Sequence, residues 1–96
     1  MTNADVSRRI KAVIKSYLSA ANQECPDLGP STKLVRDTAL SSDDGVNLVL
    51  DLCTEFAIML PEDFNAIVHD DGKRDRTLAE LVTYIQGCVN LEEQTQ

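Results

Sequence analysis

Apolar residues recur at helical spacing in several stretches of the chain, and this periodicity predicts its elements. From Val6 to Leu18, apolar positions return every three or four residues, while the basic side chains fall largely on the opposite face. We therefore expect a first amphipathic helix here. The next stretch, roughly twenty residues long, contains Pro26, Gly29 and Pro30, which interrupt helices and predict a long irregular loop.

A second helix is expected to begin after Ser41. The Ser41 side chain can accept a hydrogen bond from a free N–H of the first turn, and Asp43 and Asp44 suit the positive end of the helix dipole. Ser42 then occupies the first helical position, with its hydroxyl at the mouth of the helix rather than in the core. The helical period continues to about Ala57. Its apolar residues are Val46, Val49, Leu50, Leu52, Cys53 and Phe56.

Two further helices are expected in the second half of the chain. Pro61 opens a short one of no more than about two turns, with Phe64, Ile67 and Val68 as its apolar face. A last helix begins with a capping box at Thr77. Its buried stripe comprises Leu78, Leu81, Val82, Ile85 and Val89.

The combined pattern predicts an all-α fold. No segment alternates apolar and polar residues with turn signals at hairpin spacing, so no sheet is expected. We expect a small four-helix bundle of three long helices and one short helix, with the long loop joining the first two. Because 96 residues leave room for one core only, the chain should form a single domain over residues 1–96, with its core at about 6–90.

Acidic residues are concentrated in the middle of the chain. The whole sequence holds 16 Asp and Glu against 9 Lys and Arg, and the net charge of -7 disfavours nucleic acid and anionic membranes as partners. Nine of the acidic residues lie between Asp37 and Gly72, a segment without Lys or Arg. Such a segment suits a basic partner surface, although the same charge would also keep a small domain soluble. The candidate partner-binding residues are Asp43, Asp44, Asp51 and Glu55.

Three cysteines and one histidine limit the chemistry that this chain can perform. Cys53 and Cys88 lie within apolar helical patterns and suit packing as small hydrophobes, while Cys25 falls in the loop. An odd number of cysteines without zinc-ligand spacing favours a reducing cytoplasm and predicts no metal site. With His69 as the only histidine, a catalytic triad is excluded, and we expect no catalytic residues. The longest apolar run, Phe56 to Leu60, is too short to span a membrane.

The predicted second helix and the turn after it resemble those of the acyl carrier proteins, a family of phosphopantetheine carrier domains. Residues 46–61, VNLVLDLCTEFAIMLP, are similar to the family's second helix and the turn after it, and end in the family's Glu-Phe-x-Ile-x-Ile/Leu-Pro pattern. The sequence also resembles the start and the core face of the family's last helix, at Thr77, Leu81, Tyr84 and Ile85. The resemblance covers nearly the whole chain, including the order of its elements.

In that family, a serine at the start of the second helix is esterified to 4'-phosphopantetheine, usually within a Gly-x-Asp-Ser-Leu motif. Counting back from Glu55 without a gap places this serine at Ser42. Ala39, Ser41 and Asp43 replace the usual Gly, Asp and Leu. The resemblance implies a protein that performs no catalysis and holds an acyl or aminoacyl group as a thioester on the arm. Apolar residues that would shelter a lipid chain are Leu52, Phe56, Ile58, Leu60, Phe64, Ile67 and Ile85.

The resemblance also implies the partners of the protein. These are a phosphopantetheinyl transferase, which adds the arm, and acyl-transfer or synthase enzymes with basic surfaces in fatty acid or lipid biosynthesis. We expect a cytoplasmic monomer that meets them by diffusion. The alternative is a carrier-like bundle without an arm, acting as an interaction or regulatory module through its acidic second helix. Asp43 favours this alternative, because a carboxylate cannot make the apolar contact that the family's Leu offers to the modifying enzyme.

Overall fold

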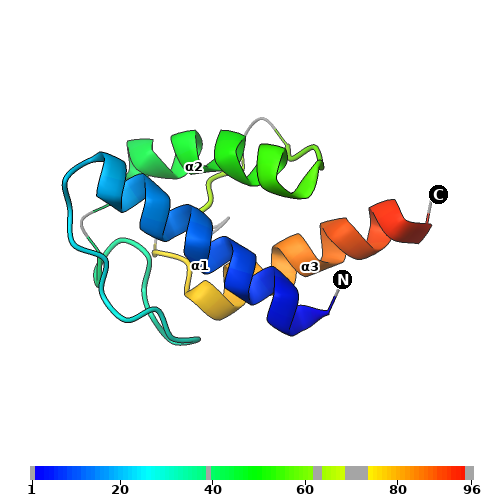
Figure 1. Cartoon of the computed structure of the whole chain (residues 1–96), viewed down its shortest axis with the longest axis horizontal. Coiled ribbons are helices and arrows are strands. Elements are labelled where there is room, and N and C mark those ends of the chain that lie inside the picture. Colours follow the sequence, from blue (N-terminus) through cyan, green and yellow to red (C-terminus); the bar gives the residue numbers. More distant parts are fainter. Residues whose placement is uncertain (1, 39, 62–63, 69–73, 95–96) are drawn as a thin grey trace.

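Three helices make up the regular structure of the described part of the chain (Figure 1). A computed structural model describes residues 2–38, 40–61, 64–68 and 74–94. The helices are α1 (Asn3–Ala20), α2 (Ser42–Phe56) and α3 (Leu78–Gln94). No strand occurs in the described ranges, so the all-helical class is confirmed. None of the helices in these ranges is long and apolar enough to cross a membrane.

The four-helix bundle predicted from the sequence is wrong, because the short helix expected after Pro61 does not form in residues 64–68. The side chain of Asn65 explains the difference. Its Oδ1 atom accepts hydrogen bonds from the N–H groups of Ile67, at 2.9 Å, and Val68, at 3.1 Å. An asparagine that binds nearby backbone in this way offers the chain an alternative to the helix. Three helices and an irregular segment therefore replace the bundle of three long helices and one short helix.

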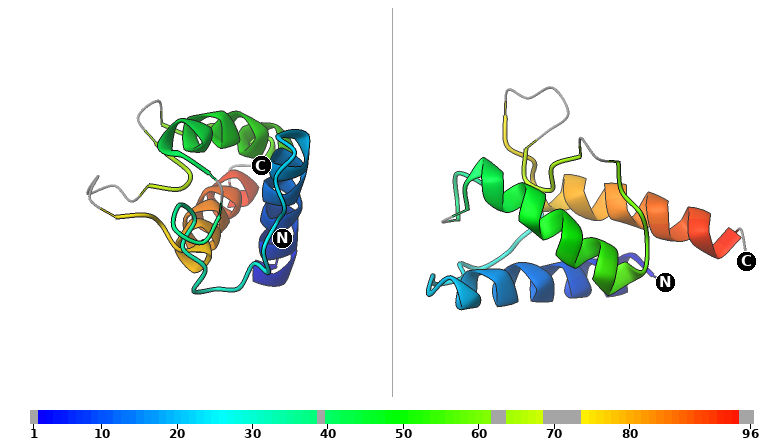
Figure 2. Two further views of the ribbon diagram at one scale, coloured as in Figure 1. Left: turned by 90° about the vertical axis from the view of Figure 1, so that its left-hand side faces the viewer. Right: turned by 90° about the horizontal axis from the view of Figure 1, so that it is seen from above.

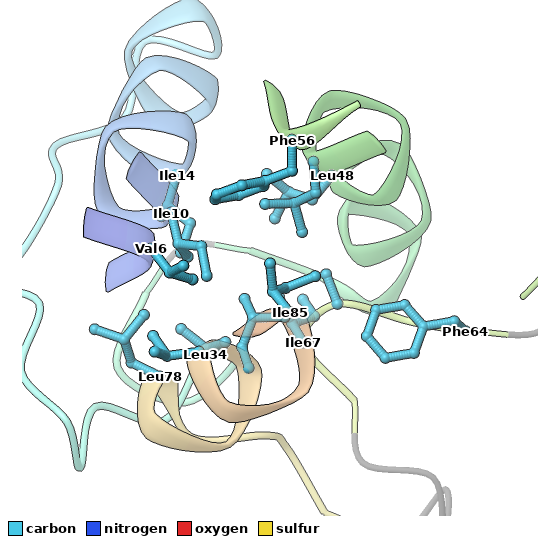
Figure 3. Packing of buried hydrophobic residues seen from close by; sticks show 14 of the residues in the cluster. Val6, Ile10, Ile14, Leu34, Leu48, Phe56, Phe64, Ile67, Leu78 and Ile85 are labelled. Atoms are coloured by element: carbon cyan, nitrogen blue, oxygen red, sulfur yellow. The ribbon is translucent and has the colours of Figure 1, made fainter. Parts of the chain in front are cut away.

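The central element of the fold is α1. It packs against α2 and against α3, as the two turned views show (Figure 2). Its buried stripe consists of Val6, Ile10, Ile14 and Leu18. Figure 3 shows the first three of these residues in one core with Phe56 of α2, Ile85 of α3 and Leu34 of the loop between α1 and α2. The core is therefore closed by irregular segments as well as by helices.

Backbone hydrogen bonds anchor the long loop between α1 and α2 to the start of α3. The N–H of Leu34 donates to the Arg76 carbonyl at 3.0 Å, and the N–H of Leu78 donates to the Thr32 carbonyl at 2.9 Å. Leu34 and Leu40 of the loop are themselves buried. Backbone bonds and burial together fix the path of the chain into α2, which is where the candidate site lies.

The irregular segment 64–68 packs onto the first turn of α2. The Ala66 N–H donates to the carbonyl of Gly45 at 3.4 Å. Gly45 is buried, and a Cβ at this position would lie 2.7 Å from the Cγ atom of Asn65. Such a distance is too short for a contact between carbon atoms. The glycine therefore permits the segment to approach the helix that begins at Ser42.

Candidate functional site

The candidate attachment residue is the first residue of α2. Ser41 precedes it in an extended conformation and is the N-cap, and Ser42 is the first helical residue, as the sequence predicts. The Asp44 carboxylate accepts the Ser41 N–H at 2.7 Å and the Ser41 hydroxyl at 3.1 Å, both on Oδ2. The side chain of Ser42 lies outside the described part of the structure, as does the backbone of Ala39.

Asp44 also joins the start of α2 to the last turns of α1. The Tyr17 hydroxyl donates to Oδ1 of Asp44 at 2.6 Å, and Nδ2 of Asn47 donates to the Tyr17 oxygen at 3.3 Å. The Ser41 N–H, followed by the Tyr17 hydroxyl, lowers the pKa of the Asp44 carboxyl. The hydrogen bond to Asp44 in turn raises the pKa of the Tyr17 phenol. Both oxygens of the carboxylate are thus engaged within the chain.

Glu55 has a cationic partner that its sequence neighbourhood does not reveal. The Nε atom of Arg9, in α1, lies 3.1 Å from Oε1 of Glu55, and its Nη2 atom donates to the Glu55 carbonyl at 2.6 Å. The guanidinium carbon of Arg9 also lies 5.0 Å from the ring centroid of Phe56. The acidic segment therefore has a countercharge in the folded chain, supplied by α1.

Asp43 and Asp51, in contrast, point to solvent. Both are exposed, and neither makes a side-chain hydrogen bond or ion pair with the described residues. They share the outer side of α2 with two apolar side chains, Val46 at 55% exposure and Leu50 at 67%. We call this surface the open face of α2. Its exposed residues are Asp43, Val46, Asn47, Leu50, Asp51 and Thr54.

Val46 and Leu50 belong to the apolar period expected for this helix, but they are not part of the core. A helical projection of the sequence already indicates that these two residues are exposed. Leu48, Leu52 and Phe56 lie four residues apart and form the buried stripe. At 100° per residue, Val46 and Leu50 project almost opposite to Leu48. Their exposure leaves an apolar strip on the open face that the sequence interpretation missed.

The apolar residues proposed to shelter a lipid chain form part of the packed core. Six are buried and Leu60 is half-buried; the buried ones are Leu52, Phe56, Ile58, Phe64, Ile67 and Ile85. Among the described residues, surface hollows of about 150, 270 and 340 Å³ lie along α1 and are lined by other residues. In the described part of the chain, the residues that the resemblance assigns to cargo are thus core side chains or pack against the core.

None of the three cysteines forms a disulfide in the described part of the chain. Cys25, Cys53 and Cys88 are free thiols and half-buried, and burial raises the pKa of the Cys88 thiol, which makes it less reactive. The described residues include no group of three side chains placed to hold a metal ion. His69 lies outside the described residues.

No family model, no curated protein and no solved structure matches this chain. The resemblance to the acyl carrier proteins therefore rests on the residues of the chain itself.

Proposed function

We propose that the chain is an acyl carrier protein, which holds an acyl or aminoacyl group as a thioester on a 4'-phosphopantetheine arm at Ser42 and presents it to partner enzymes. One observation carries this proposal. The serine that the motif singles out is the first residue of α2, and the same helix exposes Asp43, Val46, Leu50 and Asp51 along one face. An acceptor residue and a surface for partners thus lie on a single element.

The residues at the start of α2 fit a prosthetic group of this kind. The phosphodiester of the arm is an anion, and the positive end of a helix dipole and its free N–H groups favour an anion there. Hydrogen bonds from the Ser41 N–H and the Tyr17 hydroxyl stabilise the negative charge of the Asp44 carboxylate. Asp43 is the acidic side chain left open beside Ser42. When bound, the arm would supply a terminal thiol for the thioester.

The open face of α2 is the proposed docking surface for the transferase and the acyl-transfer or synthase enzymes. Its carboxylates, Asp43 and Asp51, suit a basic partner surface, and steering by such charges raises association rates. Its apolar residues, Val46 and Leu50, would lose their contact with water on docking, which stabilises the complex. Asp44 and Glu55 support this surface from within and are not proposed as direct contacts.

As a carrier, the protein would be a cytoplasmic monomer that takes its cargo from one enzyme to the next. A lipid cargo would have to displace core side chains, because Phe64 and Ile67 are buried and Phe64 stacks on Tyr84 with ring centroids 4.4 Å apart. A short or polar cargo requires no such displacement. We therefore favour a cargo that remains outside the core.

Intact mass measurement tests the attachment. The protein would be coexpressed with a broad-specificity phosphopantetheinyl transferase, alongside Ser42→Ala and the neighbouring control Ser41→Ala. We expect the parent and Ser41→Ala to gain the mass of one arm and Ser42→Ala to gain nothing. Absence of any gain in the parent, or a gain that persists in Ser42→Ala, contradicts the proposal.

The second candidate function is that of an unmodified interaction module, and Asp43 favours it. Its exposed carboxylate stands beside Ser42, where the family has an apolar residue for the modifying enzyme. Such a module would use the same open face to bind a basic partner. The mass experiment separates the two functions, because only the carrier acquires an arm.

A further inference from the structure

The side chain of Asp44 connects the first turn of α2 to α1 through hydrogen bonds. Oδ2 of Asp44 binds the Ser41 N–H at 2.7 Å, while the Asp44 N–H donates to the Ser41 carbonyl at 3.0 Å. These two bonds close a ring of residues 41–44 that includes the backbone of Ser42. Oδ1 of Asp44 then accepts the hydroxyl of Tyr17 at 2.6 Å, which comes from 27 residues earlier in the chain.

We propose that Tyr17 is a positioning residue for the modification of Ser42. It acts through Asp44, because its hydroxyl holds the ring of residues 41–44 in one orientation relative to the rest of the domain. This inference rests on the proposed function and adds a residue from another helix, in a position that neither the motif nor the acidic segment indicates.

The chemistry of the modification explains why orientation matters. The Ser42 oxygen forms a bond to the phosphorus of coenzyme A that carries the pantetheine arm, and the pyrophosphate P–O bond breaks. The leaving group, adenosine bisphosphate, takes the electron pair of that bond, and the hydroxyl proton passes to a base of the transferase. A transfer of this kind depends on the alignment of the attacking oxygen. A first turn that fluctuates presents the oxygen in many orientations and slows the step.

The hydrogen bond from Tyr17 is suited to this role. It is short, and its acceptor is ionised, which makes it stronger than a bond between neutral groups. Asn47 donates to the Tyr17 oxygen from the second turn of α2, at 3.3 Å, so that α2 holds the tyrosine at two positions. On the other side of the first turn, the Ala66 N–H donates a hydrogen bond to the Gly45 carbonyl.

The test is steady-state kinetics of modification with a broad-specificity transferase and coenzyme A, comparing the parent, Tyr17→Phe and Thr2→Ala. Tyr17→Phe removes the hydroxyl and keeps the aromatic side chain. Thr2→Ala removes a side-chain bond to the Asp5 N–H at the far end of α1 and serves as the control for a general loss of stability. We expect Tyr17→Phe to lower kcat by about tenfold and to change KM for the carrier by less than about twofold, because the open face of α2 is untouched. Thr2→Ala should keep the parent values.

A double-mutant cycle adds a readout that general destabilisation does not produce. Once Asp44→Ala has removed the acceptor, the further change Tyr17→Phe should lower kcat by less than about twofold. Should Tyr17→Phe fail to fold by circular dichroism, Asp44→Asn decides. It removes the charge of the acceptor, and a fall in kcat upholds the inference, whereas parent kcat overturns it.

The remaining outcomes separate this inference from the proposed function. A parent protein that is not modified at all overturns the proposed function and this inference with it. A parent that is modified, with Tyr17→Phe modified at the same kcat, overturns the inference alone. The inference is equally overturned if the loss appears in KM, or if Thr2→Ala shows the same fall in kcat.

Discussion

The four carboxylates proposed as partner contacts fall into two pairs in the folded chain. Asp44 and Glu55 bind Tyr17 and Arg9 of α1, while Asp43 and Asp51 remain exposed. A carboxylate that already accepts bonds within the chain has fewer acceptor sites left for a partner's cation, and part of its charge is already compensated. Binding to partners should therefore depend on the exposed pair, and stability on the internal pair.

Charge reversal at Asp51 and Glu55 tests this division. Asp51→Lys should weaken binding to a basic transferase or synthase on the order of tenfold at low salt, and should flatten the salt dependence. It should leave the free energy of unfolding within about 0.5 kcal/mol of the parent. Glu55→Lys places a cation against Arg9 and should destabilise the fold by about 1 kcal/mol.

Binding at two salt concentrations and denaturant unfolding of both variants provide the measurement. Equal loss of binding in the two variants, with no loss of stability in Glu55→Lys, would show that all the acidic residues of the helix act as one undivided surface.

The sequence identifies these acidic residues, but it does not indicate which of them are exposed and which are bonded within the chain. The bonds that distinguish them come from residues 27 and 46 positions away in the chain, and no local pattern contains contacts of that range. The position of Ser42 at the start of α2 was predictable, because the cap and the helical period are local signals. The exposure of Val46 and Leu50 was also readable from the helical projection.

At the scale of elements, the three long helices follow from their apolar periods, while the expected short helix is lost to a competing interaction. Asn65 uses its side chain to bind the N–H groups of Ile67 and Val68, which a helix opened by Pro61 would instead bond to the backbone carbonyls four residues earlier. Apolar spacing at Phe64, Ile67 and Val68 resembles a helix face, yet the same spacing also buries side chains of an irregular segment. Periodicity over so few residues does not separate these possibilities.

Gly45 tests the contact between that segment and α2. Alanine normally favours a helix over glycine by about 1 kcal/mol. In Gly45→Ala, however, the new Cβ would lie 2.7 Å from Cγ and 2.9 Å from Nδ2 of Asn65. We expect a net loss of about 1–3 kcal/mol in the free energy of unfolding, because the segment must shift or the helix must bend.

Gly87 is the matched control for Gly45, since it lies in α3 with nothing within 4 Å of the position its Cβ would take. Gly87→Ala should stabilise the protein by up to about 1 kcal/mol. Denaturant unfolding of both variants gives the comparison. If Gly45→Ala is as stable as Gly87→Ala, the segment does not pack closely on the first turn of α2.

At the scale of the whole molecule, the two irregular parts of the chain hold each other in place. The Arg76 N–H donates to the Ile67 carbonyl at 2.7 Å, and its own carbonyl accepts the Leu34 N–H. Nearby, the Asp75 carboxylate accepts the N–H of Val35 at 3.2 Å. A connection between residues some forty positions apart does not appear in any sequence period, so these hydrogen bonds were not predicted.

Arg76 is the charged residue buried at this junction, with 3% of its surface exposed. Its guanidinium donates to the carbonyl of Val68 at 3.2 Å, and its central carbon lies 4.8 Å from the ring centroid of Phe64 and 5.7 Å from that of Tyr84. Arg76→Ala would remove the donor to the part-buried carbonyls of Asn65 and Val68 and leave a cavity beside the two rings. We expect a loss of about 3 kcal/mol in the free energy of unfolding.

Arg76→Lys and Arg74→Ala separate the contributions to that loss. Lysine keeps the charge but lacks the planar donor group that stacks on aromatic rings, so its variant should fall between the parent and Arg76→Ala. Arg74 pairs with Glu80 at 2.8 Å on the surface, and Arg74→Ala should cost no more than about 1 kcal/mol. Thermal and denaturant unfolding of the three variants provides the ranking. An Arg76→Ala protein as stable as Arg74→Ala would mean that the junction is held by its backbone bonds alone, and that the order of the loops leading to Ser42 does not depend on the buried cation.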